Sequence, residues 1–190
     1  MKTVNILICG VGGQGVLLAG DIIAECAINC GYDAKKSEVH GMAQRGGSVV
    51  SHVRYGDAIH SPLIREGEAD VILSFEEMET ARYLNFLKPG GTVIINRQQV
   101  MPMTVATGKA EYPSGIVDDI KQKVPQTFLC DGLKLSEQAG SAKTINIVLL
   151  GALAKQMDLA KDKWIATISS RVPPKTVAMN VKAFELGYQN

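Results

Sequence analysis

Residues 4–19 have the sequence VNILICGVGGQGVLLA, and this stretch decides the fold. It begins with a short, nearly continuous apolar run that ends at Gly10, which is typical of a buried parallel strand. Apolar residues then recur at helical spacing from Val16 onward, until Gly31 ends the pattern. The stretch therefore predicts a strand, a glycine turn and a helix as the opening unit of an α/β protein.

Short apolar runs and helical patterns alternate along the next part of the chain. The runs that predict strands are residues 49–55, 71–73, 92–95 and 127–129. A helix is expected over residues 76–87, where acidic residues occupy the first turn and Lys88 follows the end. Residues 49–54 and 58–60 are separated only by Tyr55-Gly56-Asp57, which predicts a hairpin or an antiparallel edge. We expect a Rossmann-like layered sheet that is mostly parallel.

The last part of the chain is helical in pattern. Apolar residues follow helical spacing from Ala142, and Pro173-Pro174 opens a final helix, where proline is tolerated in the first turn. These helices are expected to pack on the sheet, so that residues 1–190 form a single domain. The long irregular connection from Gln98 to Pro113 is a candidate for partner contacts.

Composition excludes several classes of function. Lys and Arg number 20 and Asp and Glu 19, a formal charge of +1 that offers no strong field for nucleic acid or an anionic membrane surface. The apolar runs are far shorter than the roughly 20 residues of a membrane-spanning helix. The start of the chain has no apolar segment followed by a small-residue cleavage site. We expect a cytoplasmic protein.

The four cysteines are Cys9, Cys26, Cys30 and Cys130. Their uneven spacing in a chain of 190 residues favours reduced thiols over a disulfide framework. Cys26 and Cys30 would share one face of a helix, but no CxxC and no further ligands of matching spacing accompany them. We expect no metal site and no iron–sulfur cluster in this chain.

The glycine turn is the first candidate site. Its residues are Gly10, Gly12, Gly13, Gln14 and Gly15. They fit the pattern G-x-G-x-x-G between a strand and a helix, where small residues bring backbone N–H groups and the positive helix end close to an anionic ligand. A tight turn without a ligand is the alternative.

A nicotinamide dinucleotide is a weak fit to this turn. Such a site needs an acid at the end of the second strand, and Asp33 and Glu38 lie in a segment too polar for a buried strand. The Gly-Asp pairs at residues 20–21 and 56–57 lack the further residues of a thiamine diphosphate signature. Neither a phosphate loop nor a nucleophile elbow is present.

The second candidate is the segment SEVHGMAQRGGS at residues 37–48. We single out His40, Gln44, Arg45, Gly46 and Gly47, because an imidazole, an amide, a guanidinium and exposed backbone donors suit bidentate recognition of an anion. A surface loop whose arginine pairs with an acid would have the same composition. Residue types alone leave both interpretations open.

Several motifs together resemble a known family. Residues 10–15 (GVGGQG), 37–49 (SEVHGMAQRGGSV) and 54–56 (RYG) look like the gamma-type domain of the 2-oxoacid:ferredoxin oxidoreductases. Residues 146–153 (NIVLLGAL) and 171–175 (RVPPK) are similar to the beta subunits of the indolepyruvate branch of that family. The resemblance spans nearly the whole chain.

The resemblance implies a subunit of an enzyme that converts indolepyruvate and other aryl 2-oxoacids to acyl-CoA, CO2 and reduced ferredoxin. It implies that thiamine diphosphate, Mg2+ and 4Fe-4S clusters belong to a larger alpha subunit, with coenzyme A as co-substrate. No residue of this chain is then expected to be catalytic. Both candidate segments are expected to face coenzyme A, an anionic substrate group or the alpha subunit.

Three alternatives stay open at this point. The chain could serve an enzyme acting on pyruvate, 2-ketoisovalerate or 2-oxoglutarate, because the pocket for the substrate side chain could lie on the partner. It could be a free-standing Rossmann protein that binds NAD(P), or a scaffold subunit whose glycine turn is only structural.

Overall fold

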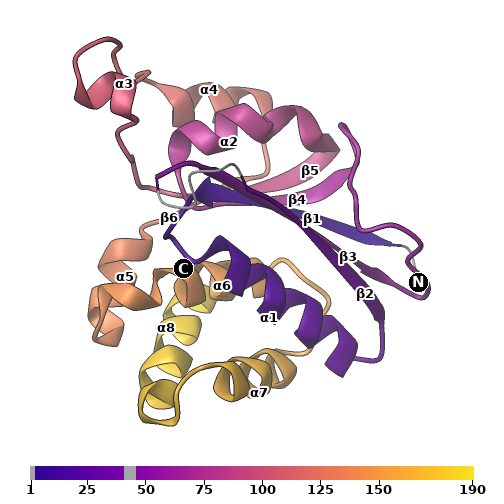
Figure 1. Ribbon diagram of the computed structural model, residues 1–190. Helices are drawn as coiled ribbons and strands as arrows, with labels where there is room; N and C mark the ends of the chain where they lie inside the picture. The colour runs from indigo at the N-terminus through magenta and orange to yellow at the C-terminus, as the bar shows by residue number, and fades with distance from the viewer. Residues whose placement is uncertain (1–2, 41–45) are drawn as a thin grey trace.

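The centre of the molecule is a six-stranded sheet in the order β2-β3-β1-β4-β5-β6 (Figure 1). The computed structural model describes residues 3–40 and 46–190, with His40 as backbone only. The strands are β1 (Val4–Val11), β2 (Asp33–His40), β3 (Ser48–Gly56), β4 (Ala69–Ser74), β5 (Leu87–Asn96) and β6 (Thr127–Cys130). Strands β1, β4, β5 and β6 are parallel neighbours, whereas β3 is antiparallel to β1 and β2. The predicted fold class, a mostly parallel sheet with an antiparallel edge, is confirmed.

Helices cover both faces of this sheet. They are α1 (Val16–Asn29), α2 (Glu77–Tyr83), α3 (Met103–Ala106), α4 (Ile116–Lys123), α5 (Gly132–Ala139), α6 (Ile145–Ala154), α7 (Lys161–Arg171) and α8 (Val177–Gln189), with short 3-10 turns η1 (Leu84–Phe86), η2 (Ala142–Thr144) and η3 (Pro174–Thr176). Figure 1 shows α1 and α5 to α8 on one side and α2 to α4 on the other. As predicted, the C-terminal helices pack on the sheet.

Strand β1 is the centre of both hydrophobic cores. Ile6, Leu7, Ile8 and Cys9 are all 0% exposed. Because side chains alternate along a strand, Ile6 and Ile8 join the core beneath α1, whereas Leu7 and Cys9 join the core beneath α2. This two-sided burial explains why the sequence of β1 is continuously apolar.

Of the two alternatives predicted for residues 49–60, the antiparallel edge is confirmed and the hairpin is not formed. Strand β3 pairs along its length with β2, and residues 58–60 form no strand. The sequence of β2 is polar because β2 is an edge strand, so its side chains need not be buried on both faces. Lys36, for example, forms ion pairs with Asp21 and Glu38.

Two glycines let α6 and α8 pack main chain against main chain. A Cβ atom on Gly151 would lie 2.1 Å from the carbonyl oxygen of Phe184, and one on Gly187 would lie 1.9 Å from that of Val148. No larger residue fits at either position without separating the helices. This close contact holds the C-terminal helix against the helix that begins beside the glycine turn.

Three helices were not expected from the sequence. Helix α3 lies inside the connection predicted to be irregular, and it has no buried residue. Helix α4 buries only Ile116 and Ile120, and α5 buries only small side chains, so neither has a strong apolar stripe. Within residues 3–40 and 46–190, no helix combines the length and the apolar character needed to cross a membrane.

Candidate functional site

The glycine turn joins the carboxyl end of β1 to the start of α1. Gly13 and Gly15 have φ angles of 104° and 89°, a region that favours glycine. Gly10 is required for a different reason, because a Cβ atom there would lie 2.7 Å from Cβ of Phe75, which follows the neighbouring strand β4. The turn is thus specified by both its backbone conformation and its close packing.

The structure brings part of the second candidate segment to this turn. The N–H of Gly12 donates to the carbonyl oxygen of Gly47 at 2.8 Å, and the N–H of Gly46 donates to the carbonyl of Gly12 at 3.3 Å. The backbone of His40 lies at the end of β2, paired with Val49. The side chain of His40, and Gln44 and Arg45, lie outside what the structure describes.

Gln14 braces the turn from within. Its Oε1 accepts from the N–H of Val11 at 2.7 Å. Its Nε2 lies 3.1 Å both from the carbonyl oxygen of Phe75 and from Oε1 of Gln98, which follow β4 and β5. The side chain predicted to bind a ligand therefore fixes the turn to the adjacent strand ends.

The start of α1 has hydrogen-bond donors without partners among residues 3–40 and 46–190. Gly15 is the N-cap, no side chain of these residues caps the helix, and the first turn holds no acid. Among the residues that the structure describes, the N–H groups of Gly13 and Gly15 donate no backbone hydrogen bond. The positive end of a helix and a set of free N–H groups are the elements of an anion-binding site.

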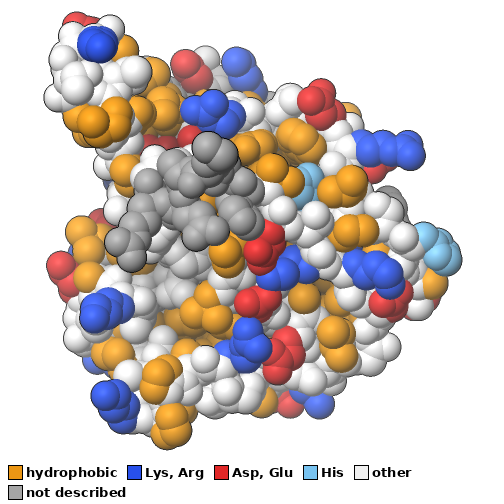
Figure 2. All heavy atoms as spheres, in the orientation of Figure 1, with side chains coloured by type: hydrophobic (Ala, Val, Ile, Leu, Met, Phe, Trp, Pro, Cys, Tyr) orange, Lys and Arg blue, Asp and Glu red, His pale blue; other side chains and the backbone are white. Residues whose placement is uncertain are grey.

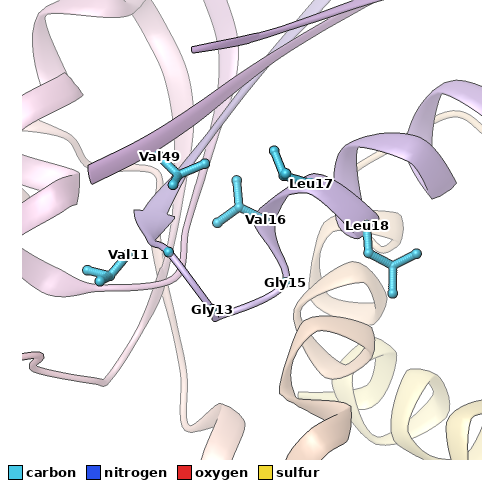
Figure 3. A pocket seen from close by; sticks show the side chains of 8 residues that line it. Val11, Gly13, Gly15, Val16, Leu17, Leu18 and Val49 are labelled. Atoms are coloured by element: carbon cyan, nitrogen blue, oxygen red, sulfur yellow. The ribbon is translucent and has the colours of Figure 1, made fainter. Parts of the chain in front are cut away.

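A pocket of about 370 Å³ lies beside the turn (Figure 3). It is lined by Val11, Gly12, Gly13, Gly15, Val16, Leu17, Leu18 and Val49. Val16 and Val49 point toward one another across it, from α1 and from β3. The pocket therefore offers apolar walls next to backbone donors, which suits a ligand with an anionic group and an uncharged part.

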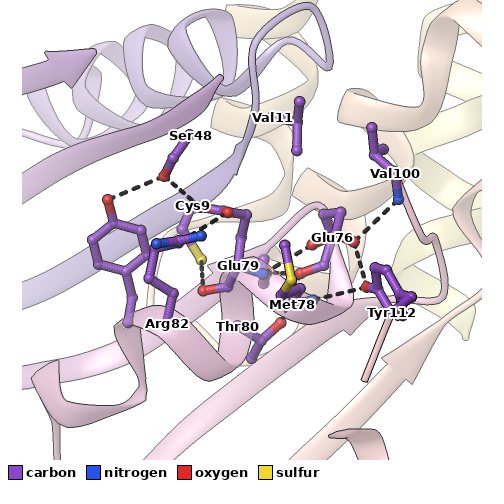
Figure 4. A network of polar contacts seen from close by, with 12 residues as sticks. Cys9, Val11, Ser48, Glu76, Met78, Glu79, Thr80, Arg82, Val100 and Tyr112 are labelled. Atoms are coloured by element: carbon purple, nitrogen blue, oxygen red, sulfur yellow. Dashed lines mark hydrogen bonds and ion pairs between the residues drawn. The ribbon is translucent and has the colours of Figure 1, made fainter. Parts of the chain in front are cut away.

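On the other face of the sheet, a network of buried acids surrounds the start of α2 (Figure 4). Glu76 is 0% exposed, and its carboxylate accepts from the N–H of Glu79 at 2.9 Å, the N–H of Val100 at 3.1 Å and the hydroxyl of Tyr112 at 2.5 Å. Burial and the adjacent carboxylate raise the pKa of the Tyr112 hydroxyl, so it stays a donor. One carboxylate thus holds α2 and both ends of the segment between Val100 and Tyr112.

Glu79 forms the second part of this network. Its carboxylate accepts from Nε of Arg82 at 3.1 Å and from the hydroxyl of Ser48, which comes from β3. Neither Glu76 nor Glu79 was predicted as part of a site. The available signal was an acid that follows a buried strand at the carboxyl edge of the sheet.

The segment from Gln98 to Pro113 projects from the molecule at the upper left of Figure 1. Met101 and Met103 are 50% and 76% exposed, and Figure 2 shows hydrophobic side chains on this projection. Its base is fixed, because Gln98 accepts from Gln14 of the turn and Val100 donates to Glu76. The projection is thus an exposed apolar surface on a rigid base next to the glycine turn.

Cys26, in α1, interacts with Cys30, the C-cap residue of that helix. Burial raises the pKa of Cys9, Cys26 and Cys130 to about 12, which keeps these thiols protonated and unreactive. Across residues 3–40 and 46–190, no three His, Cys, Asp or Glu side chains form a group that could hold a metal ion.

A mostly parallel sheet with a glycine turn at the carboxyl end of its first strand defines a Rossmann-like α/β protein. Residues 5–190 match the family model described as pyruvate ferredoxin/flavodoxin oxidoreductase. The chain belongs to this family.

Relatives and solved structures agree with this assignment. The chain is 43% identical to the indolepyruvate oxidoreductase subunit IorB of Thermococcus kodakarensis and 44% identical to that of Pyrococcus horikoshii, in each case over 98% of this chain and 95% of the relative. Relatives described as 2-oxoglutarate synthase subunit KorC are 28–29% identical. The crystal structure of the gamma subunit of a keto/oxoacid ferredoxin oxidoreductase from Geobacter sulfurreducens has a TM-score of 0.73 and 28% identity, over 98% of this chain and 96% of that one.

Proposed function

We propose that this chain is the small (beta) subunit of a ferredoxin-dependent enzyme that oxidatively decarboxylates indolepyruvate and other aryl 2-oxoacids. The products are acyl-CoA, CO2 and reduced ferredoxin. The observation that carries the proposal is the 43–44% identity to indolepyruvate oxidoreductase subunits over 98% of the chain. The 28–29% identity to subunits named for 2-oxoglutarate makes the corresponding alternative weaker.

The larger alpha subunit is proposed to carry thiamine diphosphate, Mg2+ and 4Fe-4S clusters, which supply the decarboxylation and electron transfer. The buried and protonated thiols of this chain support that division, because a cluster needs several thiolates close together. In this division the beta subunit contributes binding and orientation, and its residues 1–190 act as one domain. We place the complex in the cytoplasm.

The role of the glycine turn is proposed to be recognition of coenzyme A. Backbone N–H groups at Gly13 and Gly15 and the start of α1 would receive an anionic group. The apolar walls formed by Val16, Leu17 and Val49 would contact an uncharged part of the same molecule. Gly10, Gly12 and Gln14 hold the turn in shape through the contacts described above.

The segment that contains His40, Gln44, Arg45, Gly46 and Gly47 is proposed to face coenzyme A, the anionic substrate or the alpha subunit. Its last two residues pair with Gly12, so the segment ends beside the glycine turn. We propose that the projection carrying Met101 and Met103 contacts the alpha subunit. Methionine suits this role because its flexible thioether adapts to a partner surface.

The first experiment is purification of the chain with its native partner, followed by ferredoxin reduction assays. We expect turnover only from the complex, only with coenzyme A, and with a higher kcat/KM for indolepyruvate than for pyruvate, 2-ketoisovalerate or 2-oxoglutarate. Turnover by the isolated chain, or a preference for 2-oxoglutarate, would overturn the proposal. Calorimetric titration with NAD(H) and NADP(H) tests the dehydrogenase alternative, which predicts tight binding.

A further inference from the structure

Asn146, in the first turn of α6, is a buried polar residue against the glycine turn. The residue is 7% exposed. A Cβ atom on Gly15 would lie 3.1 Å from Nδ2 of Asn146 and 3.3 Å from its Cγ, so the carboxamide packs directly on the N-cap of α1. Within the described part of the chain, this carboxamide has no hydrogen-bond partner.

A largely buried amide without a partner is unfavourable unless water or a ligand reaches it. The carboxamide atoms of Asn146 are not among the fully inaccessible unpaired atoms, which are Ser51 Oγ, Tyr55 OH and Trp164 Nε1. A small group from outside the chain can therefore reach Asn146.

Asn180 provides a matched comparison within the same molecule. It is also 7% exposed and also lies on a C-terminal helix. Its Nδ2 donates to the carbonyl oxygen of Thr176 at 2.9 Å, so this buried amide is paired by its own helix. Asn146 differs in two ways: it has no such partner among the described residues, and it packs from α6 against the start of α1.

Three features meet at Gly15: the N-terminal N–H groups of α1, the absence of an acidic residue in its first turn, and the carboxamide of Asn146. The positive end of α1 and the carboxamide donor favour a ligand that is negative and rich in acceptor oxygens. We propose that Asn146 is a ligand-binding residue whose Nδ2 donates to a phosphate-type group seated at the start of α1. The proposal rests on the proposed function, in which the turn recognises coenzyme A.

The test compares variants in the purified two-subunit complex. Asn146→Asp keeps the shape of the side chain and places a carboxylate where the donor was, so we expect the KM for coenzyme A to rise roughly 100-fold, the range of a lost charge-assisted hydrogen bond plus repulsion. Asn146→Ala should raise it about tenfold. In both variants kcat and the KM for indolepyruvate should stay within about twofold of wild type. The control Asn180→Ala should leave the KM for coenzyme A unchanged.

Calorimetry on the complex identifies the source of the phosphate-type group. If the group belongs to coenzyme A, Asn146→Asp weakens binding of coenzyme A but not of pantetheine, which has no phosphate. If it is free phosphate, inorganic phosphate binds to wild type and not to Asn146→Asp. Equal loss with coenzyme A and pantetheine, or no change with any of the three probes, would overturn the inference.

The two proposals fail in different ways. A complex that does not turn over any 2-oxoacid with coenzyme A overturns the proposed function. A complex that is active, but in which Asn146→Asp changes neither the KM for coenzyme A nor the binding of inorganic phosphate, overturns the role of Asn146 alone. If Asn146→Asp does not fold, Asn146→Ala decides, because its smaller side chain creates no buried charge.

Discussion

Helices α1 and α2 begin at the same edge of the sheet, after the neighbouring parallel strands β1 and β4, yet their first turns are opposite in character. Helix α1 starts at Gly15, with no side-chain cap and no acid. Helix α2 starts at Glu76, whose carboxylate accepts from Glu79 N–H, and its first turn also holds Glu77 and Glu79. Both helices present a positive end there. The fold neutralises that of α2 with its own carboxylates, whereas the first turn of α1 holds no acid, and we propose that an external anion takes this place.

The largest effect should come from removing the internal anion of α2. Glu76→Ala takes away the N-cap and leaves Val100 N–H and the Tyr112 hydroxyl without their acceptor. We expect a loss of about 3 kcal/mol in the free energy of unfolding, measured by urea denaturation. The base of the 98–113 projection should also become more accessible to proteolysis.

Two variants check the interpretation of Glu76. Glu76→Gln keeps one acceptor oxygen and should lose less than Glu76→Ala. Glu77→Ala removes an acid of the same turn that accepts only from Gln99 at the surface, and should change stability by less than about 0.5 kcal/mol. Equal losses in Glu76→Ala and Glu77→Ala would contradict the assignment of the buried carboxylate as the cap.

At the start of α1, the side chain that holds the turn in place is the amide of Gln14. Gln14→Ala removes the acceptor for Val11 N–H and the links to Phe75 and Gln98. We expect a loss of about 2 kcal/mol in unfolding free energy and a higher KM for coenzyme A in the complex. Gln126→Ala is the control, because the side chain of this exposed glutamine accepts from Thr92 at the surface, and its backbone bond to Val93 is unaffected by the change. A stable variant with an unchanged KM would mean that the turn keeps its shape without Gln14.

The stability of the face of the sheet that α2 covers should depend on pH through His52. Burial lowers the pKa of His52 below 6.5, and its Nδ1 accepts from the N–H of Ile64 at 3.2 Å. The unfolded chain binds a proton at His52 at a higher pH than the folded chain does. Burial of the neutral imidazole therefore contributes fully to the free energy of unfolding above pH about 6.5. This contribution is lost as the pH falls toward the pKa of His52 in the folded chain.

His52→Asn, which keeps an acceptor atom near the position of Nδ1, should lose this part of the pH dependence. Urea unfolding at pH 7.5 and pH 5.5 measures it. Gln14→Ala should keep the wild-type dependence of the unfolding free energy on pH, because Gln14 lies at the start of α1 and does not contact His52. Identical slopes in wild type and His52→Asn would show that another group is responsible.

The smallest effect on stability is expected from giving α1 the kind of charge that α2 already has. Leu17 is 38% exposed in the first turn of α1. Leu17→Glu should be more stable than the neutral control Leu17→Gln by a few tenths of a kcal/mol, because a carboxylate interacts favourably with the helix end. The same carboxylate should compete with an anionic ligand and raise the KM for coenzyme A above that of Leu17→Gln. Both differences should decrease at high salt.

The sequence predicted the β1–turn–α1 unit correctly because its signals are local: a continuous apolar run, glycines, and helical spacing. The same local reasoning gave no reason to place Gly47 against Gly12, since that contact depends on how β3 pairs with β1. It also missed Glu76 and Asn146. Their importance comes from burial of a polar group, and burial depends on residues distant in the chain.

Polarity had opposite meanings in two places. The polar sequence of β2 did not predict a buried strand, and β2 is in fact an edge strand that pairs with a neighbour on one side only. At Glu76 it suggested an ordinary first-turn acid, whereas the carboxylate is fully enclosed. Only the tertiary arrangement separates these cases.

The charged edge strand has a consequence for the chain before it meets its partner. An exposed edge presents unpaired backbone groups to which a strand of another molecule can add, and this is a common route to aggregation. The side chains of β2 include Lys35 and Lys36, and the opposite edge, β6, is only four residues long. Newly made copies should therefore resist joining edge to edge, which keeps them available for assembly.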